Sequence, residues 1–134
     1  MTLYVDSSAL LKAYVDEPDS DVAVAHLQSD PVLVTSWVTV AEVRRNLARL
    51  LDGPARRAAS SAFERDIDAV ALVAAGEEVC RSASRIGEVL GVRSLDAIHL
   101  ASAQSLQIPS LPFLTFDLRQ AQAARSLGLV VLGS

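Results

Sequence analysis

The stretch Leu3-Tyr4-Val5-Asp6-Ser7-Ser8-Ala9-Leu10, close to the N-terminus, decides the fold of this chain. Its first three residues are apolar and predict a buried strand, and the residues after the aspartate repeat apolar side chains at helical spacing. A carboxylate at the end of an apolar strand must be solvated by something other than bulk water. A cation is the obvious candidate for that partner.

Three further acidic residues stand in similarly apolar surroundings. Glu42 lies within residues 38–43, Asp96 lies within 95–101, and Asp117 directly follows 113–116. Four unpaired acids brought together would repel one another and raise one another's pKa values, whereas a divalent cation makes such a cluster favourable. The sequence therefore predicts a metal site built from Asp6, Glu42, Asp96 and Asp117.

The remaining chain alternates short apolar runs with longer helical stretches, which is typical of a parallel α/β fold. Strands are predicted at residues 2–5, 32–35, 69–73, 113–116 and 129–132, and helices at 7–15, 21–28, 38–51, 54–67, 76–90, 95–106 and 118–127. In such sheets, ligands bind outside the carboxyl ends of the strands. Asp6 and Asp117 each follow a strand, so we expect them to meet there, with the helices that carry Glu42 and Asp96 leaning over the same edge.

Length and composition indicate one ordered domain over residues 1–134. The chain has 134 residues, of which 51% are hydrophobic and 21% charged, and it contains no low-complexity stretch. No apolar run reaches the roughly 18–20 residues that a membrane span needs, and the N-terminus has no basic region before an apolar one, so we expect a cytoplasmic protein. Cys80 is the single cysteine, which excludes an internal disulfide, and we expect it to be a small buried residue on a helix.

The formal net charge of −4 is weak evidence against a nucleic-acid partner, because the four proposed ligands account for all of it. The positive charge is also concentrated. Five arginines fall within residues 44–57: Arg44, Arg45, Arg49, Arg56 and Arg57. A solvated helical face is the first interpretation of this group, and contact with phosphates is the alternative.

A site made of carboxylates suits Mg²⁺ or Mn²⁺, which prefer oxygen ligands, and argues against zinc. His26 and His99 are too few and too far apart for a zinc site of the usual helical spacing. A divalent cation held by carboxylates can activate water and neutralise phosphate oxygens, which is the chemistry of phosphodiester hydrolysis. Whether the site holds one ion or two stays open.

Several polar and aromatic residues are candidates for roles beside the acids. Ser7 and Thr115 place hydroxyls next to Asp6 and Asp117, where they would support a ligand, although Ser7 could equally cap the helix that it precedes. His99 is expected to be a hydrogen-bonded structural residue, and Trp37 to be buried in the core instead of stacking on a base.

Each acid also has a plain structural explanation. Asp6 and Asp117 could be helix N-caps, and Asp96 could complement the helix dipole in a first turn. Glu42 could be an exposed acid paired with Arg45 or Arg49. These explanations are reasonable singly, but four such coincidences in one chain are a weaker hypothesis than a common site.

Other functional classes fit less well. A phosphatase of the haloacid dehalogenase type would need a second aspartate at position 8, where this chain has Ser8, and a receiver domain would need a lysine after a late strand, whereas Lys12 is the only lysine. A catalytically silent module that binds RNA or protein is the more serious rival. Loss of one acid would have favoured it, and none is lost.

Taken together, the motifs resemble the PIN-domain ribonucleases of the VapC toxin type. The matching pieces are Tyr4-Val5-Asp6-Ser7-Ser8-Ala9-Leu10, Ala41-Glu42-Val43, Leu95-Asp96-Ala97-Ile98-His99-Leu100-Ala101-Ser102-Ala103 and Leu114-Thr115-Phe116-Asp117. Each piece is short, but the ordered set covers essentially the whole chain.

The resemblance implies a fold, a reaction and partners. The fold is a three-layer α/β/α sandwich around a parallel sheet of about four to five strands. The reaction is endonucleolytic cleavage of RNA, often tRNA or rRNA, with Mg²⁺ or Mn²⁺ bound by Asp6, Glu42, Asp96 and Asp117, and with Ser7 and Thr115 as accessory polar positions. The partners are a second copy of the chain and a VapB-like antitoxin, which we expect to cover the acids, with an Arg or Lys displacing the metal.

Overall fold

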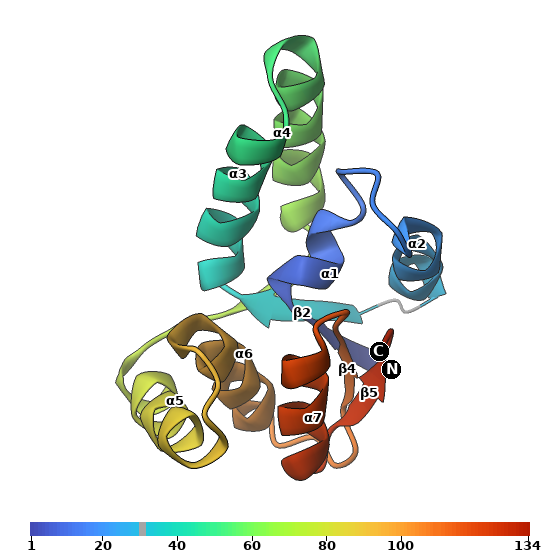
Figure 1. Ribbon diagram of the computed structural model, residues 1–134. Helices are drawn as coiled ribbons and strands as arrows, with labels where there is room; N and C mark the ends of the chain where they lie inside the picture. Colours follow the sequence, from blue (N-terminus) through green and yellow to red (C-terminus); the bar gives the residue numbers. More distant parts are fainter. Residues whose placement is uncertain (30–31) are drawn as a thin grey trace.

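A parallel sheet of five strands forms the middle layer of the computed structural model, which describes residues 1–29 and 32–134 (Figure 1). The strands are β1 (Thr2–Val5), β2 (Val32–Ser36), β3 (Ala71–Val73), β4 (Pro112–Leu114) and β5 (Val130–Leu132). Their order across the sheet is β3-β2-β1-β4-β5, and every pair is parallel. The chain therefore builds the sheet outward from β1 in one direction and then returns to the other side of β1, so the strand order reverses between β1 and β4.

Helices cover both faces of the sheet. One face carries α1 (Ser7–Leu11), α2 (Ser20–Ser29), α3 (Val38–Leu50) and α4 (Gly53–Ile67), and the other carries α5 (Glu77–Leu90), α6 (Ser94–Ser105) and α7 (Leu118–Ser126). In Figure 1 the first group lies above the sheet, where α3 and α4 form a projecting hairpin, and the second group lies below it. This arrangement confirms the expected three-layer α/β/α fold.

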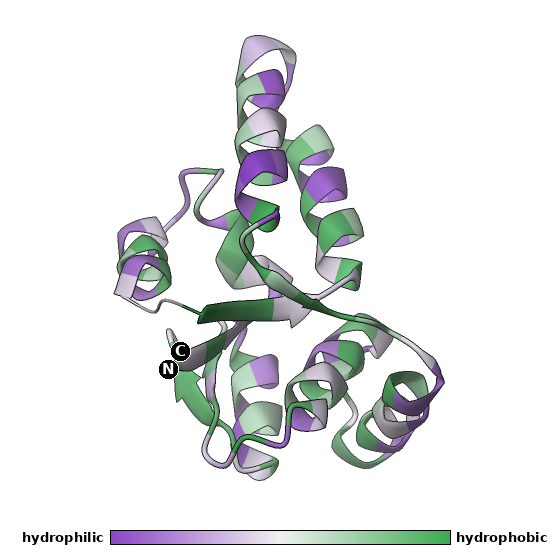
Figure 2. Cartoon of the chain, turned by 180° about the vertical axis from the view of Figure 1, so that it is seen from behind, coloured by the Kyte–Doolittle hydropathy of each residue, from purple (hydrophilic) through white to green (hydrophobic). Residues whose placement is uncertain are grey.

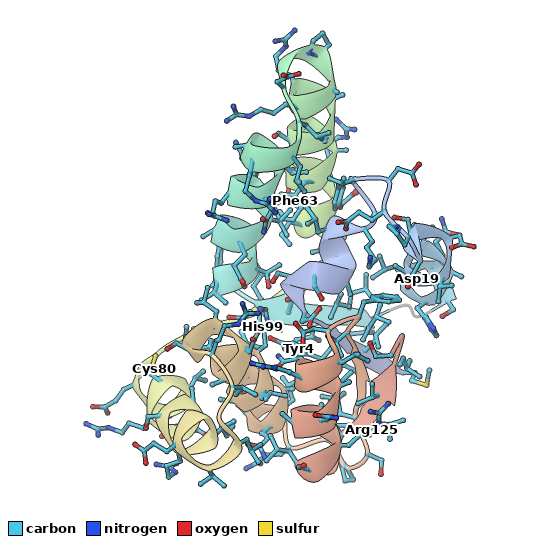
Figure 3. The ribbon with its side chains drawn as sticks, viewed as in Figure 1. Tyr4, Asp19, Phe63, Cys80, His99 and Arg125 are labelled. Carbon is cyan, nitrogen blue, oxygen red and sulfur yellow. The ribbon has the colours of Figure 1, made fainter. Side chains whose placement is uncertain are left out.

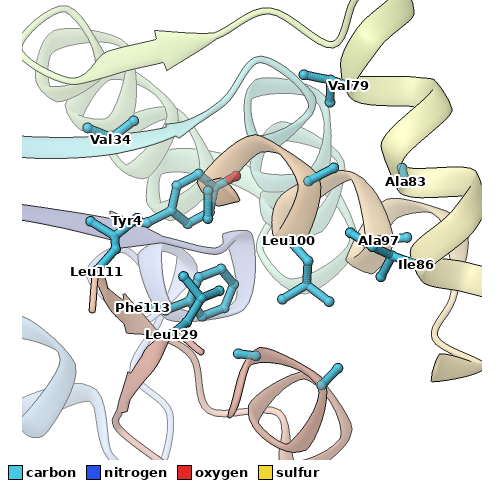
Figure 4. Packing of buried hydrophobic residues seen from close by; sticks show 14 residues of the cluster. Tyr4, Val34, Val79, Ala83, Ile86, Ala97, Leu100, Leu111, Phe113 and Leu129 are labelled. Atoms are coloured by element: carbon cyan, nitrogen blue, oxygen red, sulfur yellow. The ribbon is translucent and has the colours of Figure 1, made fainter. Parts of the chain in front are cut away.

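Two apolar cores, one on each face, follow from the alternation of side chains along β1. Tyr4 points to the face covered by α5, α6 and α7, and its ring stacks on Phe113 with centroids 5.1 Å apart (Figure 4). Leu3 and Val5 point to the opposite core, which α1, α3 and α4 share. The strands are mostly hydrophobic, as the green parts of the arrows in Figure 2 show, and β2 turns polar at its end, at Thr35 and Ser36. Mostly apolar strands are typical of sheets covered on both faces.

The element order predicted from periodicity is confirmed throughout, and the differences lie at the ends of elements. The first helix ends at Leu11 instead of Val15, because the chain tightens into turns in which Ala13 and Tyr14 donate backbone hydrogen bonds three residues back. The strand predicted to reach Phe116 ends at Leu114. Two residues of loop therefore separate β4 from Asp117.

Two predictions about burial were wrong. Cys80 is exposed on α5, because the buried stripe of that helix is formed by Val79, Ala83 and Ile86. Trp37 is 55% exposed, because it sits at the corner before α3, where its backbone N–H donates to Val73 of β3 while its side chain stays outside the core. In the part of the chain that the structure describes, no helix is long and apolar enough to cross a membrane.

Candidate active site

The four acids lie around the carboxyl edge of β1 and β4, where the strand order reverses. Val5 pairs with Leu114 across these strands, and the backbone N–H of Asp6 donates to the Leu114 carbonyl oxygen at 3.2 Å. Asp6 directly follows β1, and Asp117 follows β4 after the two-residue loop. The edge at such a reversal is the usual binding crevice of an open α/β sheet. The expectation that Asp6 and Asp117 follow strands meeting at one edge is therefore confirmed.

Asp6 is buried, with 4% of its surface exposed, and it caps the N-terminus of α1. Its Oδ1 accepts hydrogen bonds from the Ser8 hydroxyl at 2.7 Å and the Ala9 backbone N–H at 3.0 Å. Burial raises the pKa of the Asp6 carboxyl above its ordinary value, although the charge of His99 and hydrogen bonds from Thr115, Ser8 and Ala9 oppose the shift. An ionised Asp6 is thus stabilised incompletely by the protein alone, and a bound cation would supply the missing charge.

Glu42, on α3, is held by a histidine from the other side of the sheet. Its Oε1 lies 2.8 Å from His99 Nε2, and His99 Nδ1 lies 2.9 Å from the Tyr4 hydroxyl. His99 is buried and hydrogen-bonded on both ring nitrogens, as expected. The alternative that pairs Glu42 with Arg45 or Arg49 is wrong, because the ion-pair partner of Glu42 is His99. Figure 3 shows His99 and Tyr4 side by side, between the helices of one face of the sheet and those of the other.

Asp96 and Asp117 share a cation and a scaffold residue. Arg93 lies with Nε 3.2 Å from Asp96 Oδ2 and with its terminal nitrogen 3.9 Å from Asp117 Oδ2. Gln120 is fully buried, donates its side-chain amide to the Asp96 carbonyl oxygen at 3.0 Å, and donates its backbone N–H to Asp117 Oδ1 at the same distance. A pocket of about 280 Å³ opens between Asp96, Asp117, Arg93 and Arg119.

The acids therefore form two groups. In one, His99 is hydrogen-bonded to Glu42 and acts on Asp6 through its charge. In the other, Arg93 lies beside both Asp96 and Asp117. Within residues 1–29 and 32–134, no three His, Cys, Asp or Glu side chains are arranged to hold an ion as they stand. Electrostatics accounts for this, since carboxylates repel one another and each turns to the cation or donor nearest to it. The donor set fits a hard divalent cation, because it offers carboxylate oxygens and includes the buried Asp6, which forms no ion pair with any described arginine or lysine.

Sequence reasoning missed three contributors to this arrangement. Ser8, and not its neighbour Ser7, donates to Asp6, and the accessory role of Ser7 stays a prediction. The Thr115 hydroxyl accepts from the Asp117 backbone N–H at 3.2 Å, and its accessory role, like that of Ser7, stays a prediction. Arg93 and Gln120 each lie three residues from an acid across the start of a helix, with Arg93 at the N-cap of α6 and Asp117 at the N-cap of α7, and this spacing could have identified them.

Replacing Arg93 with Gln is expected to strengthen Mn²⁺ binding, because it removes a cation that competes for Asp96 and Asp117. The Arg93 side chain is 80% exposed, and an exposed ion pair contributes at most about 1 kcal/mol, so the gain in affinity should be up to roughly fivefold. Isothermal titration calorimetry with Mn²⁺ measures it. Arg119→Gln is the matched control, since Arg119 lines the same pocket, and equal shifts for both variants would show a general charge effect instead of competition.

Comparison with known proteins identifies the family of the chain. Residues 3–126 match the model of the PIN domain family. The chain is 35% identical to the ribonuclease VapC46 of Mycobacterium tuberculosis, with 97% of this chain and 95% of that protein covered. It superposes on FitAcB from Neisseria gonorrhoeae with a TM-score of 0.73 at 21% identity, covering 97% of this chain and 96% of that one.

A toxin–antitoxin complex from Klebsiella pneumoniae has the same fold, with a TM-score of 0.73 at 15% identity and coverage of 100% of this chain and 98% of that one. These structural likenesses establish the shared fold. The family match spans most of the sequence, and the relative with 35% identity extends over nearly the whole chain. The chain therefore belongs to the PIN-domain family, among the ribonucleases of the VapC type.

Proposed function

We propose that this chain is a divalent-metal-dependent endoribonuclease that acts as the toxin of a toxin–antitoxin pair. The observation that carries the proposal is the placement of Asp6, Glu42, Asp96 and Asp117 around one sheet edge, in a family whose relative VapC46 is named a ribonuclease. We place the whole of residues 1–134 in a single PIN domain and its action in the cytoplasm, where RNA is translated.

The four carboxylates would hold Mg²⁺ or Mn²⁺, with Asp6 as the buried and most strongly fixed member. When bound, such a cation activates a water for attack on the phosphodiester and neutralises phosphate charge. The Ser8 hydroxyl and the Ala9 backbone N–H hold the Asp6 carboxylate in place. Gln120 joins the backbones that carry Asp96 and Asp117, so that these two acids keep a fixed separation.

Arg93 has to leave its position between Asp96 and Asp117 when a metal binds. Its long, exposed side chain can swing toward the solvent, where it would face the phosphate backbone of a bound RNA. The exposed arginines of α3 and α4 are further candidates for backbone contacts, except that Arg44 is paired with Glu64. Such contacts would position RNA without reading its sequence.

The proposed partners are RNA, a VapB-like antitoxin and a second copy of this chain. The Klebsiella pneumoniae protein of the same fold is described as a toxin–antitoxin complex, which supports the antitoxin. We expect an antitoxin to inhibit by placing an Arg or Lys side chain beside the acids, much as Arg93 lies between Asp96 and Asp117 within the chain itself. Candidate dimer surfaces are the helices within residues 7–28 and 38–51, where Val22 and Leu50 remain exposed.

Cleavage of total cellular RNA by the purified chain tests the proposal. We expect cuts at a few positions in the presence of Mg²⁺ or Mn²⁺, loss of all cuts in EDTA, and recovery when Mn²⁺ is added back, because the proposed hydrolysis needs a water that a bound cation activates. Sequencing of the cut ends would identify the target. A folded, metal-loaded and antitoxin-free protein that binds RNA but leaves it intact would support the silent binding module instead.

A further inference from the structure

A chain of buried hydrogen bonds joins three of the four elements that carry the acids. Tyr4 lies on β1 two residues before Asp6, His99 lies on α6 three residues after Asp96, and Glu42 lies on α3. The bonds run from the Tyr4 hydroxyl to His99 Nδ1 at 2.9 Å and from His99 Nε2 to Glu42 Oε1 at 2.8 Å. One imidazole thus connects the strand and both helices.

The spacing places Tyr4 and His99 on the side of the acids. Residues two apart on an extended strand point to the same face, and residues three apart on a helix share a face. Tyr4 is therefore on the Asp6 side of β1, and His99 on the Asp96 side of α6. His99 is 1% exposed and Tyr4 is 0% exposed, so water does not compete for either hydrogen bond.

The direction of the two hydrogen bonds follows from their partners. A carboxylate can only accept, so His99 carries a proton on Nε2 and donates it to Glu42. With that proton on Nε2, the other ring nitrogen, Nδ1, can accept from the Tyr4 hydroxyl, so the two hydrogen bonds have compatible directions. Glu42 then has one oxygen fixed by His99 and the other left for a further partner.

We propose that His99, oriented by Tyr4, is a positioning residue that fixes the Glu42 carboxylate for metal binding. This inference rests on the proposed function and deepens it, since it names residues that act through Glu42 without touching the metal. Ligating side chains are generally held by hydrogen bonds of this kind, and loss of such an outer partner costs roughly 10- to 100-fold in metal affinity.

The packing role of Tyr4 can be separated from its hydrogen bond. Its ring stacks on Phe113 with an interplanar angle of 5°, and Phe would keep that stacking while removing the hydroxyl. Tyr14→Phe is the matched control. The Tyr14 hydroxyl donates to Asp66 at 2.7 Å and its ring packs on Phe63, so the same single oxygen is lost from a place remote from the acids.

The test is Mn²⁺ affinity of the full chain by isothermal titration calorimetry, which needs no substrate. We expect Glu42→Gln and His99→Leu to weaken binding roughly 10- to 100-fold and Tyr4→Phe roughly 10-fold, whereas Tyr14→Phe leaves it unchanged. His99→Gln should recover part of the loss, because its amide can donate to Glu42. Tyr4→Phe in the Glu42→Gln background should add no further loss, since the carboxylate that it positions is already gone.

The outcomes separate this inference from the proposed function. If Glu42→Gln weakens Mn²⁺ binding and the Tyr4 and His99 variants bind as the unsubstituted chain does, the positioning role is overturned and the metal site stands. If the unsubstituted chain and Glu42→Gln bind Mn²⁺ equally, or neither binds it, the metal site itself is wrong and the inference fails with it. If His99→Leu does not fold, Tyr4→Phe decides, and additive losses in the double variant would also overturn the proposal.

Discussion

Replacing Asp6 with Asn is expected to reduce RNA cleavage at least about 100-fold and to leave the protein folded. The loss should exceed the roughly 10- to 100-fold effect of removing an outer hydrogen-bond partner, because Asp6 is itself a proposed ligand. Its carboxylate is buried beside the sheet edge, and no other described carboxylate lies at the end of β1. Asn has the same shape, so the measured change reports the lost charge and oxygen.

The same substitution should not lower the free energy of unfolding of the metal-free protein. Asn is as good an N-cap as Asp, so the hydrogen bond from the Ala9 N–H to residue 6 can persist. Burial raises the pKa of Asp6, which means that the ionised carboxylate is disfavoured in the folded state at neutral pH, and the amide removes that cost. Urea denaturation in EDTA measures the stability, and cleavage of the mapped RNA measures activity.

Asp52→Asn is the matched control for this prediction. Asp52 also stands at a helix N-cap, in the loop between α3 and α4, but its side chain makes no capping hydrogen bond. This loop is the tip of the projecting hairpin in Figure 1. The Asp52→Asn variant should cleave RNA as well as the unsubstituted chain does. If Asp6→Asn cleaves within a few-fold of Asp52→Asn, Asp6 is an N-cap and not a ligand.

The layers of this fold follow from the sequence because the central strands β1 and β4 are short apolar runs that are buried in the sheet, and helices such as α3 and α5 have one buried apolar stripe. The local hydrophobic pattern is therefore enough to predict the order of strands and helices and their arrangement in layers. The errors at Cys80 and Trp37 have a different origin, since neither lies on the buried stripe of its helix. Cys80 is one position beyond a buried residue, and Trp37 is placed by a corner between β2 and α3. The periodicity of apolar residues does not show which of two adjacent helical positions faces the core, nor how the chain turns at a corner.

The four acids could be proposed as a site from the sequence because carboxylates in apolar runs are costly unless something other than bulk water solvates them. The residues that hydrogen-bond to these acids or pair with them were harder to predict from the sequence. His99 meets Glu42 across 57 residues of sequence, and Arg93 reaches Asp117 from the start of α6, so both contacts depend on how the layers close over the sheet. The preference of Asp6 for Ser8 over Ser7 depends on which hydroxyl the first turn of α1 directs back to the cap. These are properties of tertiary geometry.

Replacing Phe63 with Ala is expected to lower the free energy of unfolding by about 3–5 kcal/mol, a large share of the roughly 5–15 kcal/mol typical of a domain. Phe63 is 0% exposed and fills the core between α4, α1 and α3, beside Leu11, Val43 and Leu47. Its ring meets Tyr14 edge to face at 5.5 Å, a contact that Ala cannot make. Urea denaturation of the metal-free chain measures the loss.

Leu50→Ala is the control on the same hairpin, because Leu50 is 39% exposed and its truncation should change the unfolding free energy by no more than about 0.5 kcal/mol. Phe63 touches none of the four acids, yet it anchors the hairpin whose first helix carries Glu42. Its loss should therefore also weaken Mn²⁺ binding, and Mn²⁺ should restore part of the stability by favouring the folded state. A Phe63 variant as stable as the Leu50 variant would mean that α4 is not part of the core that supports Glu42.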